Sequence, residues 1–195
     1  MFEYLMPALW MRTYPNTLLE RSRIAAVRSQ QAYAAGKRIP WGISESAYFK
    51  TDEAGNYQYH AFGLSRLALR KPELNALVIS PYSTFLALHV DPSGALRNLR
   101  RMMHEGWFGA YGFYEAADFD RSRRRSWRHR PELVRCWMAH HQGMTLLSIA
   151  NFLHNDVMLD CFHTNRRVQA TELLLHEKPV AHVRAVRAIY RTAAA

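Results

Sequence analysis

Apolar residues recur at helical spacing in several segments, and each segment follows a residue that can cap a helix. The apolar positions from Leu18 to Val27 come directly after Thr17, and Glu20 stands three residues beyond that threonine, the spacing of a capping box. This pattern predicts an amphipathic helix that ends near Gly36.

Further helices are expected later in the chain. Ser80-Pro81 and Asp91-Pro92 each place a polar residue before a proline, which favours a helix start with proline at the first helical position. The stretch from Leu133 to Leu153 is apolar over most of a helical circumference and predicts one long helix buried on several sides. Asp156 and Asn165 are candidate caps for two shorter helices.

The segments between these helices lack helical periodicity. In residues 39–72, Tyr57 and Tyr59 alternate with polar residues after Gly55-Asn56, which predicts a small hairpin or an extended loop. Residues 106–119 are rich in glycine and aromatic residues and are expected to form a loop. The pattern predicts about six helices joined by long loops, an all-α fold class.

Composition and charge narrow the function classes. The chain has 195 residues, 49% of them hydrophobic, with 26 Lys and Arg against 16 Asp and Glu. One domain with a hydrophobic core is therefore expected. The run Arg121–Arg130 is either an arm for nucleic acid or another anion, or a solvated loop in an arginine-rich chain. Because no helix-turn-helix, RNP-like strand or Cys/His finger accompanies this run, no nucleic-acid partner is expected. An arginine-based binder of anions or nucleic acid ranks third, behind the two functions considered below.

Location and redox state follow from what the sequence lacks. No apolar run approaches the roughly 18 residues that cross a bilayer, and the first residues have no basic start, so no membrane span and a cytoplasmic location are expected. Cys136 and Cys161 are too few for a disulfide framework and lie among apolar neighbours, which predicts inert buried thiols.

Two glutamates in the long loops are candidates for acid–base chemistry. Glu45 lies in Pro40–Tyr48 and Glu115 in Gly109–Ala116. Glycosidic cleavage needs one carboxyl group to protonate the leaving oxygen and a second to activate water or attack the anomeric carbon. Aromatic neighbours can stack on sugar rings and raise a carboxyl pKa by desolvation. The candidates for these contacts are Trp41, Tyr57, Tyr59, Tyr111 and Tyr114. The alternative is that each glutamate only pairs with an arginine.

His140, His141 and Gln142 stand together inside the predicted long helix. Adjacent helical positions point about 100° apart and no histidine follows at i+4, so no metal site is expected. The histidines either make one hydrogen bond each in the core or contact sugar hydroxyl groups. No glycine-rich phosphate loop occurs, and no cofactor is expected.

Seven motifs, taken together, resemble the glucoamylase-like domain of bacterial cyclic β-1,2-glucan synthases and related β-1,2-glucan hydrolases. They occur in the family's order and span nearly the whole chain. They are Met1–Pro7, Tyr14-Pro-Asn-Thr-Leu-Leu19, Pro40-Trp-Gly-Ile-Ser-Glu-Ser-Ala-Tyr48, Asn56-Tyr-Gln-Tyr59, Tyr111-Gly-Phe-Tyr-Glu-Ala116, Met138-Ala-His-His-Gln-Gly-Met144 and Arg167–Leu175.

The resemblance implies an (α/α)6 barrel that acts on β-1,2-linked glucose polymers, by hydrolysis or by the transglycosylation that closes a glucan ring. It places the family's acidic loop motifs on Glu45 and Glu115, without indicating which is the acid, and a pocket-lining role on His140, His141 and Gln142. It also implies parent synthases associated with the inner membrane.

A complete (α/α)6 barrel has twelve helices, and about six are expected here. The resemblance therefore implies an incomplete toroid: a C-terminal barrel portion over residues 1–180 and an Arg/Ala-rich tail over 181–195. Such a portion would expose apolar surface, so self-association or pairing with the missing half is expected. A non-catalytic remnant that at most binds glucan is the alternative to an active enzyme.

Overall fold

The computed structural model describes residues 1–68, 76–120 and 130–177. Within these residues the helices are α1 (Phe2–Leu5), α2 (Leu18–Lys37), α3 (Pro81–Leu86), α4 (Pro92–His104), α5 (Ala139–Leu153), α6 (Val157–His163) and α7 (Arg166–Thr171), with 3-10 helices η1 (Met6–Leu9) and η3 (Glu172–His176). The strands are β1 (Ser46–Thr51), β2 (Tyr57–His60), β3 (Val78–Ile79), β4 (Phe108–Gly109), β5 (Gly112–Phe113), β6 (Ala116–Asp118) and β7 (Glu132–Val134).

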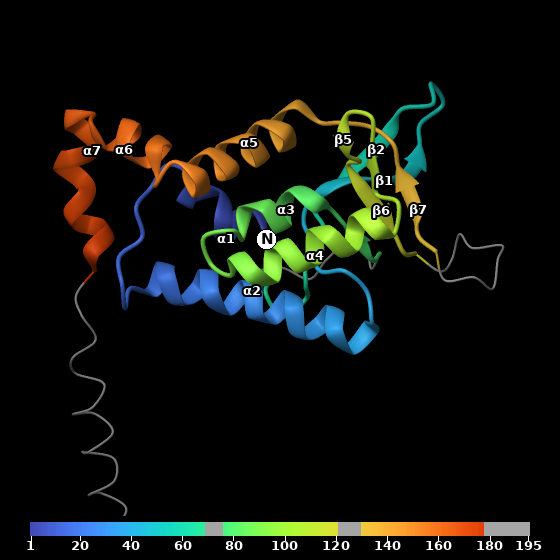
Figure 1. Ribbon diagram of the computed structural model, residues 1–195, viewed down its shortest axis with the longest axis horizontal. Helices are drawn as coiled ribbons and strands as arrows, with labels where there is room; N and C mark the ends of the chain where they lie inside the picture. The colour runs from blue at the N-terminus through green and yellow to red at the C-terminus, as the bar shows by residue number, and fades with distance from the viewer. Residues whose placement is uncertain (69–75, 121–129, 178–195) are drawn as a thin grey trace, which may run out of the picture.

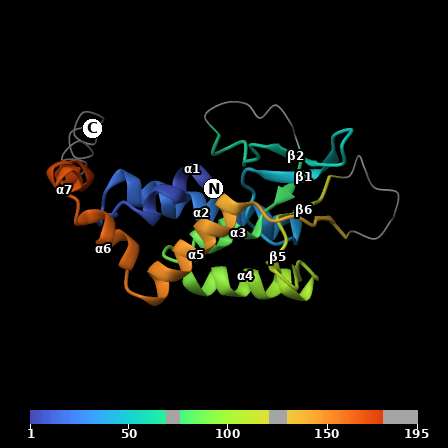
Figure 2. The same cartoon turned by 90° about the horizontal axis from the view of Figure 1, so that it is seen from above.

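Helices α2 to α5 form the body of the molecule, and α3 packs against both α4 and α5. The strands gather at one end of this body, whereas α6 and α7 lie at the other end (Figure 1). The view from above shows the same division (Figure 2).

The described residues contain three small antiparallel sheets, so the prediction of an all-α fold is not confirmed. Strands β1 and β2 form the predicted hairpin, β3, β6 and β7 form a three-stranded sheet in that order, and β4 pairs with β5. Within the described residues the chain is thus a helical body with sheets at one end. The alternation of inner and outer helices in a barrel stays a prediction, as does the boundary between residues 1–180 and the tail. The tail and residues 121–129 of the arginine run lie outside the described residues.

The predicted start of α2 is confirmed. The Thr17 hydroxyl oxygen accepts a hydrogen bond from the Glu20 amide at 3.2 Å, which caps the helix. The Glu20 carboxylate accepts from the Asn16 amide at 2.6 Å, one residue before the cap, rather than from Thr17 as in a complete capping box. The helix runs past Gly36 to Lys37 and ends where Arg38 adopts the left-handed conformation with φ 57°.

The start of α4 is likewise confirmed, because the Asp91 carboxylate accepts a hydrogen bond from the Gly94 amide at 2.9 Å. Ser80 does not cap α3 through its side chain. Its hydroxyl instead donates to the main-chain oxygen of Glu115 at 2.6 Å, which ties the start of α3 to the loop that carries this glutamate.

The long helix predicted from Leu133 is wrong at its start. Leu133 and Val134 belong to strand β7, paired with Ala117 and Ala116 of β6, and α5 begins only at Ala139. The side of α5 that is buried carries His141, Met144, Ser148 and Asn151, so this helix buries one mostly polar face rather than several apolar sides. The pairing partner of residues 132–134 is distant in sequence, so no local pattern revealed it.

The core consists of two clusters. One lies around the sheets and includes Ile43, Met102 and Trp107, and the other lies among the helices and includes Leu5 and Leu86. Among the described helices, none combines the length and apolar character that a bilayer span requires.

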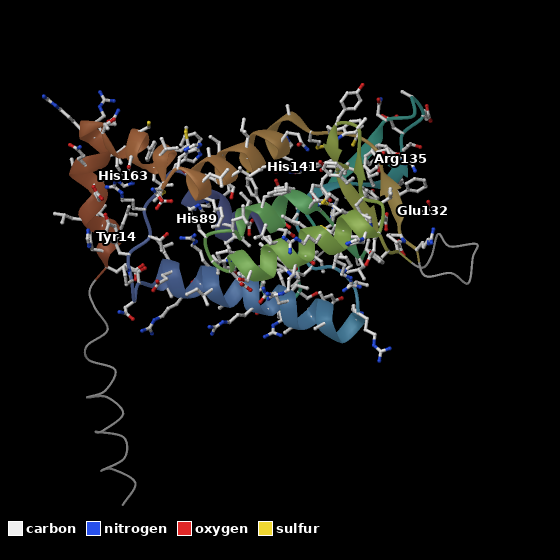
Figure 3. The ribbon with its side chains drawn as sticks, in the orientation of Figure 1. Tyr14, His89, Glu132, Arg135, His141 and His163 are labelled. Carbon is white, nitrogen blue, oxygen red and sulfur yellow. The ribbon has the colours of Figure 1, made fainter. Side chains whose placement is uncertain are left out.

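Polar contacts fasten the N-terminal segment to the last helices, at the end labelled Tyr14 and His163 in Figure 3. The Arg12 amide donates to His163 Nε2 at 3.2 Å, and the Arg12 guanidinium lies 2.7 Å from the Asp160 carboxylate. The Tyr14 hydroxyl donates to the Glu172 carboxylate. These contacts join segments some 150 residues apart in the chain and give α6 and α7 a fixed place.

Candidate functional site

The loop that carries Glu45 is extended, and side-chain amides from two helices bind its main chain. Gln30 of α2 donates to the Ile43 carbonyl at 2.8 Å and accepts from the Ile43 amide at 3.0 Å. Asn98 of α4 makes the same pair of bonds with Trp41, at 2.8 and 3.0 Å. Because these groups are buried, the loop conformation depends on these bonds.

Helix α3 binds the same loop from a third side. The Tyr82 hydroxyl donates to the Glu45 carbonyl at 3.1 Å and lies 2.9 Å from the Ser44 hydroxyl. The Ser83 hydroxyl donates to the Gly42 carbonyl at 3.0 Å. Gly42 has φ 129°, and a Cβ there would lie 2.7 Å from the Ser83 hydroxyl oxygen, so the position requires glycine.

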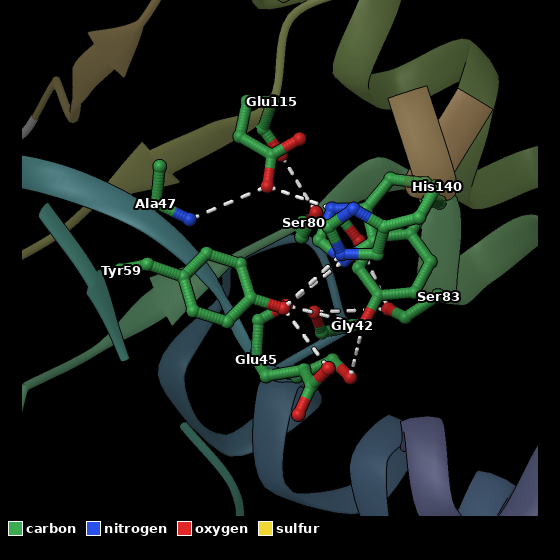
Figure 4. Close-up of polar contacts among 11 residues, drawn as sticks. Gly42, Glu45, Ala47, Tyr59, Ser80, Ser83, Glu115 and His140 are labelled. Atoms are coloured by element: carbon green, nitrogen blue, oxygen red, sulfur yellow. Dashed lines mark hydrogen bonds and ion pairs between the residues drawn. The ribbon is translucent and has the colours of Figure 1, made fainter. Parts of the chain in front are cut away.

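The β1–β2 hairpin brings Tyr59 to Glu45. Ala47 pairs with Tyr59 in this hairpin, and the Tyr59 hydroxyl donates to Glu45 Oε1 at 2.9 Å. The same hydroxyl lies 3.4 Å from Nε2 of His140 and 3.4 Å from Nε2 of His141 (Figure 4). Partial burial and the hydrogen bond to Glu45 raise the pKa of Tyr59, so the phenol stays protonated.

Glu115 approaches the same residues from the other side. Its side chain is 1% exposed, and Oε1 lies 2.8 Å from His141 Nδ1 and accepts from the Ala47 amide at 3.3 Å. Glu115 and Glu45 are therefore linked through His141 and Tyr59. Figure 4 labels both glutamates and Tyr59. The sequence places these four residues in three separate segments, and the fold brings them together.

The two adjacent histidines lie closer than their helical positions suggested. His141 is fully buried and stacks on Tyr82 with centroids 3.7 Å apart, whereas His140 is exposed. Their ring centroids are 4.0 Å apart. Burial, and next the neighbouring His141, lower the pKa of His140 and favour its neutral form. Potential ligand atoms of Glu45, His140 and His141 all lie within 4.8 Å of one another, which the angle between adjacent helical positions did not predict.

A cavity of about 200 Å³ adjoins Glu115. Its lining combines aromatic rings with a few polar groups, the composition typical of small-ligand sites. Among the residues that line it are Tyr82, Phe85, Phe113, Tyr114, Glu115 and Gln142.

The predicted aromatic contacts are divided between the surface and the core. Tyr59 and Tyr114 lie beside the glutamates, and Tyr111 is 79% exposed. Trp41 is 7% exposed in the core, so its indole has little surface left for a sugar, and Tyr57 packs against the other core cluster.

Sequence reasoning missed three contributors to the site. Tyr82 follows the predicted helix start at Ser80-Pro81 and was not among the candidate site residues, yet it contacts His141 and the Glu45 main chain. Ser80 holds the Glu115 main chain instead of capping a helix. Trp137, which is 38% exposed, lies edge-on to Tyr111 at 5.4 Å and tilted against Tyr114 at 5.6 Å. Its position just before the Met138 motif was the available signal.

The cysteines differ from each other. Burial raises the pKa of Cys136 to about 11, in keeping with the expected inert thiol. Cys161 is exposed, so the prediction of a buried thiol there is wrong: it faces outward on α6.

Comparison with known proteins identifies the family of the chain. The Glycoamylase family model, described as "Putative glucoamylase", matches residues 1–166. The chain belongs to the Glycoamylase family. The match includes both glutamates, Tyr59 and the histidine pair.

This member of the Glycoamylase family is 38% identical over 183 residues to the cyclic β-(1,2)-glucan synthase NdvB of Rhizobium meliloti (strain 1021). The alignment covers 91% of the chain but 6% of the synthase, so the chain spans a small part of that relative.

Two solved structures are similar in fold. An endo-β-1,2-glucanase from Chitinophaga pinensis, in complex with sophorotriose and glucose, matches with a TM-score of 0.59 at 19% identity, over 90% of this chain and 40% of that one. A β-1,2-glucanase from Parabacteroides distasonis matches with a TM-score of 0.63 at 16% identity, over 91% of this chain and 24% of that one. At these identities the likeness concerns the fold.

Proposed function

We propose that this chain contributes the site that cleaves or transfers glycosidic bonds in a β-1,2-linked glucan, with Glu45 and Glu115 as its two reacting carboxyl groups. The observation that carries the proposal is the convergence of both glutamates on Tyr59 and His141, beside a cavity lined by aromatic rings. The similarity to the synthase and the two glucanases named above supports β-1,2-glucan as the substrate class.

The surroundings of the two glutamates suit different roles. Glu115 Oε1 accepts an N–H from Ala47 and faces His141 Nδ1, and these buried contacts hold its carboxyl group in one orientation. We assign Glu115 the anionic role, which stabilises positive charge at the anomeric carbon or attacks it. Glu45 is half-buried and its Oε1 contacts only the phenol of Tyr59 among the hydrogen bonds described, so it is the group assigned to protonate the leaving oxygen.

The aromatic residues at the cavity complete the proposal. Tyr114 and Gln142 offer a ring face and an amide to a pyranose, and the exposed Tyr111 and Trp137 extend the aromatic surface beyond it. A sugar placed there would have Glu115 at its edge.

The experiment compares Glu45→Gln and Glu115→Gln with the unaltered chain on linear β-1,2-glucan, measuring new reducing ends and ring products. Each substitution is expected to lower kcat/KM by about 100-fold or more, the usual contribution of a general acid or base. Glu53→Gln, on the exposed tip of the β1–β2 hairpin, is the matched control and should retain activity. Unchanged turnover in both site variants would refute the assignment.

A non-catalytic glucan-binding module is the second candidate, favoured by the aromatic lining of the cavity, which suits sugar binding whether or not the glutamates react. It predicts no turnover by the unaltered chain or either variant, together with a rise in melting temperature when glucan is added. Turnover by the unaltered chain excludes it.

A further inference from the structure

Glu45, His140 and His141 form a set of potential metal ligands at the mouth of the site. Their ligand atoms lie within 4.8 Å of one another, and they come from the Glu45 loop and the first turn of α5. Two imidazoles and one carboxylate form a ligand set that zinc proteins use where a fourth position stays open. We propose that these three residues bind a divalent transition-metal ion, Zn²⁺ foremost, and that the bound ion blocks the site.

His141 is already oriented as a metal ligand. Its Nδ1 lies 2.8 Å from the Glu115 carboxylate, and because a carboxylate only accepts, the proton of the neutral ring resides on Nδ1. Nε2 then presents its lone pair toward Tyr59, Glu45 and His140. A carboxylate on the far nitrogen of a ligating histidine is the usual supporting contact in zinc sites. Stacking on Tyr82 at 10° fixes the ring plane.

The other two ligands can move to close the site. In a tetrahedral zinc site with bonds of about 2.05 Å, neighbouring ligand atoms are about 3.3 Å apart, so the present separations of up to 4.8 Å must shorten. His140 is exposed and Glu45 is half-buried, which leaves both side chains free to rotate toward the buried His141. The Tyr59 oxygen lies 2.9 Å from Glu45 Oε1 and 3.4 Å from each imidazole nitrogen. It therefore lies between the three ligand atoms and is available as a fourth ligand.

The donor atoms also determine which ions fit. Ca²⁺ and Mg²⁺ prefer oxygen ligands, whereas two imidazole nitrogens favour Zn²⁺, Ni²⁺ or Cu²⁺. An ion on the Glu45 carboxylate removes it from proton transfer. The inhibitory effect therefore rests on the proposed function, but binding of the ion does not.

The test measures Zn²⁺ binding by the full chain without a polyhistidine tag, in competition with a chromophoric chelator. One equivalent is expected to bind. His140→Ala and Glu45→Gln are each expected to weaken binding by more than tenfold, and Glu115→Gln by about 10- to 100-fold through the supporting contact. His104→Ala removes an exposed histidine on α4 and should leave the affinity unchanged. Co²⁺ in place of Zn²⁺ should give the visible bands of a four-coordinate site, and these should be lost in His140→Ala.

Two results would overturn the proposal: no stoichiometric binding, or equal affinity in His140→Ala, His104→Ala and the unaltered chain. His140 is exposed, so its replacement should not unfold the protein, and circular dichroism checks this. Binding without any turnover on glucan would refute the proposed function and leave the metal site standing. Turnover on glucan that Zn²⁺ does not inhibit, together with no Zn²⁺ binding, would refute the metal site and leave the proposed function standing.

Discussion

Gln30 provides the sharpest test of how the fold positions Glu45. Its side chain is fully buried and makes two hydrogen bonds to the main chain of Ile43, two residues before Glu45. The substitution Gln30→Met keeps a similar length and volume but removes both the donor and the acceptor. The Ile43 amide and carbonyl then stay buried without these partners.

The expected loss of stability follows from those two groups. Each buried polar group left without a partner costs about 1–3 kcal/mol, and the apolar methionine offsets part of this, so we expect unfolding free energy to fall by about 3 kcal/mol. A domain has only about 5–15 kcal/mol in total, so the effect is large. Because the loop is also released beside Glu45, turnover on glucan should decrease even at temperatures where the variant is folded.

Urea denaturation followed by tryptophan fluorescence measures this loss, since Trp41 lies two residues from Ile43 and is buried. Gln31→Met, at the next position of α2, is the matched control. It removes one hydrogen bond, to a half-buried Asp91 carboxylate at 2.7 Å, and should cost less than about 1.5 kcal/mol. Equal losses in the two variants would refute the reasoning that Gln30 holds the loop. If Gln30→Met does not fold, Asn98→Leu tests the equivalent pair of bonds to Trp41.

Three further predictions concern stability and association. Asp91→Ala should lower the unfolding free energy by about 1 kcal/mol in urea denaturation, because it removes the N-cap of α4. Burial lowers the pKa of His89 below its ordinary value despite the nearby Asp156, so the unfolded chain binds the proton more readily than the folded chain. The unfolding free energy should therefore fall as the pH decreases below about 6.5, and His89→Gln should weaken this dependence. Leu146 and Leu153 of α5 are 67% and 65% exposed, so size-exclusion chromatography should show self-association, and replacing both with serine should reduce it.

Each of these has a contrary result. Unchanged stability in Asp91→Ala would mean that the cap contributes nothing to α4. The same pH profile in His89→Gln and the unaltered chain would assign the acid sensitivity to other groups. A compact monomer of the unaltered chain that melts cooperatively would contradict the expected self-association.

The sequence by itself determined the elements whose signals are local. The side chains of Thr17 and Asp91 each accept a hydrogen bond from an amide only three residues away, so the spacing alone predicted where α2 and α4 begin. The alternation around Tyr57 and Tyr59 predicted a hairpin or an extended loop, and the structure has the hairpin. The motif resemblance identified the family and drew attention to both glutamates.

Only the tertiary structure decided how the site is assembled. Residues 133 and 134 form a strand because they pair with β6. His141 is buried where α5 brings its Nδ1 within 2.8 Å of Glu115 Oε1. The Glu115–Ala47 and Tyr59–His141 contacts join residues 68 and 82 positions apart. Such contacts depend on packing of the whole chain rather than on spacing along it. For that reason the sequence could name the two glutamates, Tyr59 and His141 as candidates, whereas the contacts that link them emerged only from the fold.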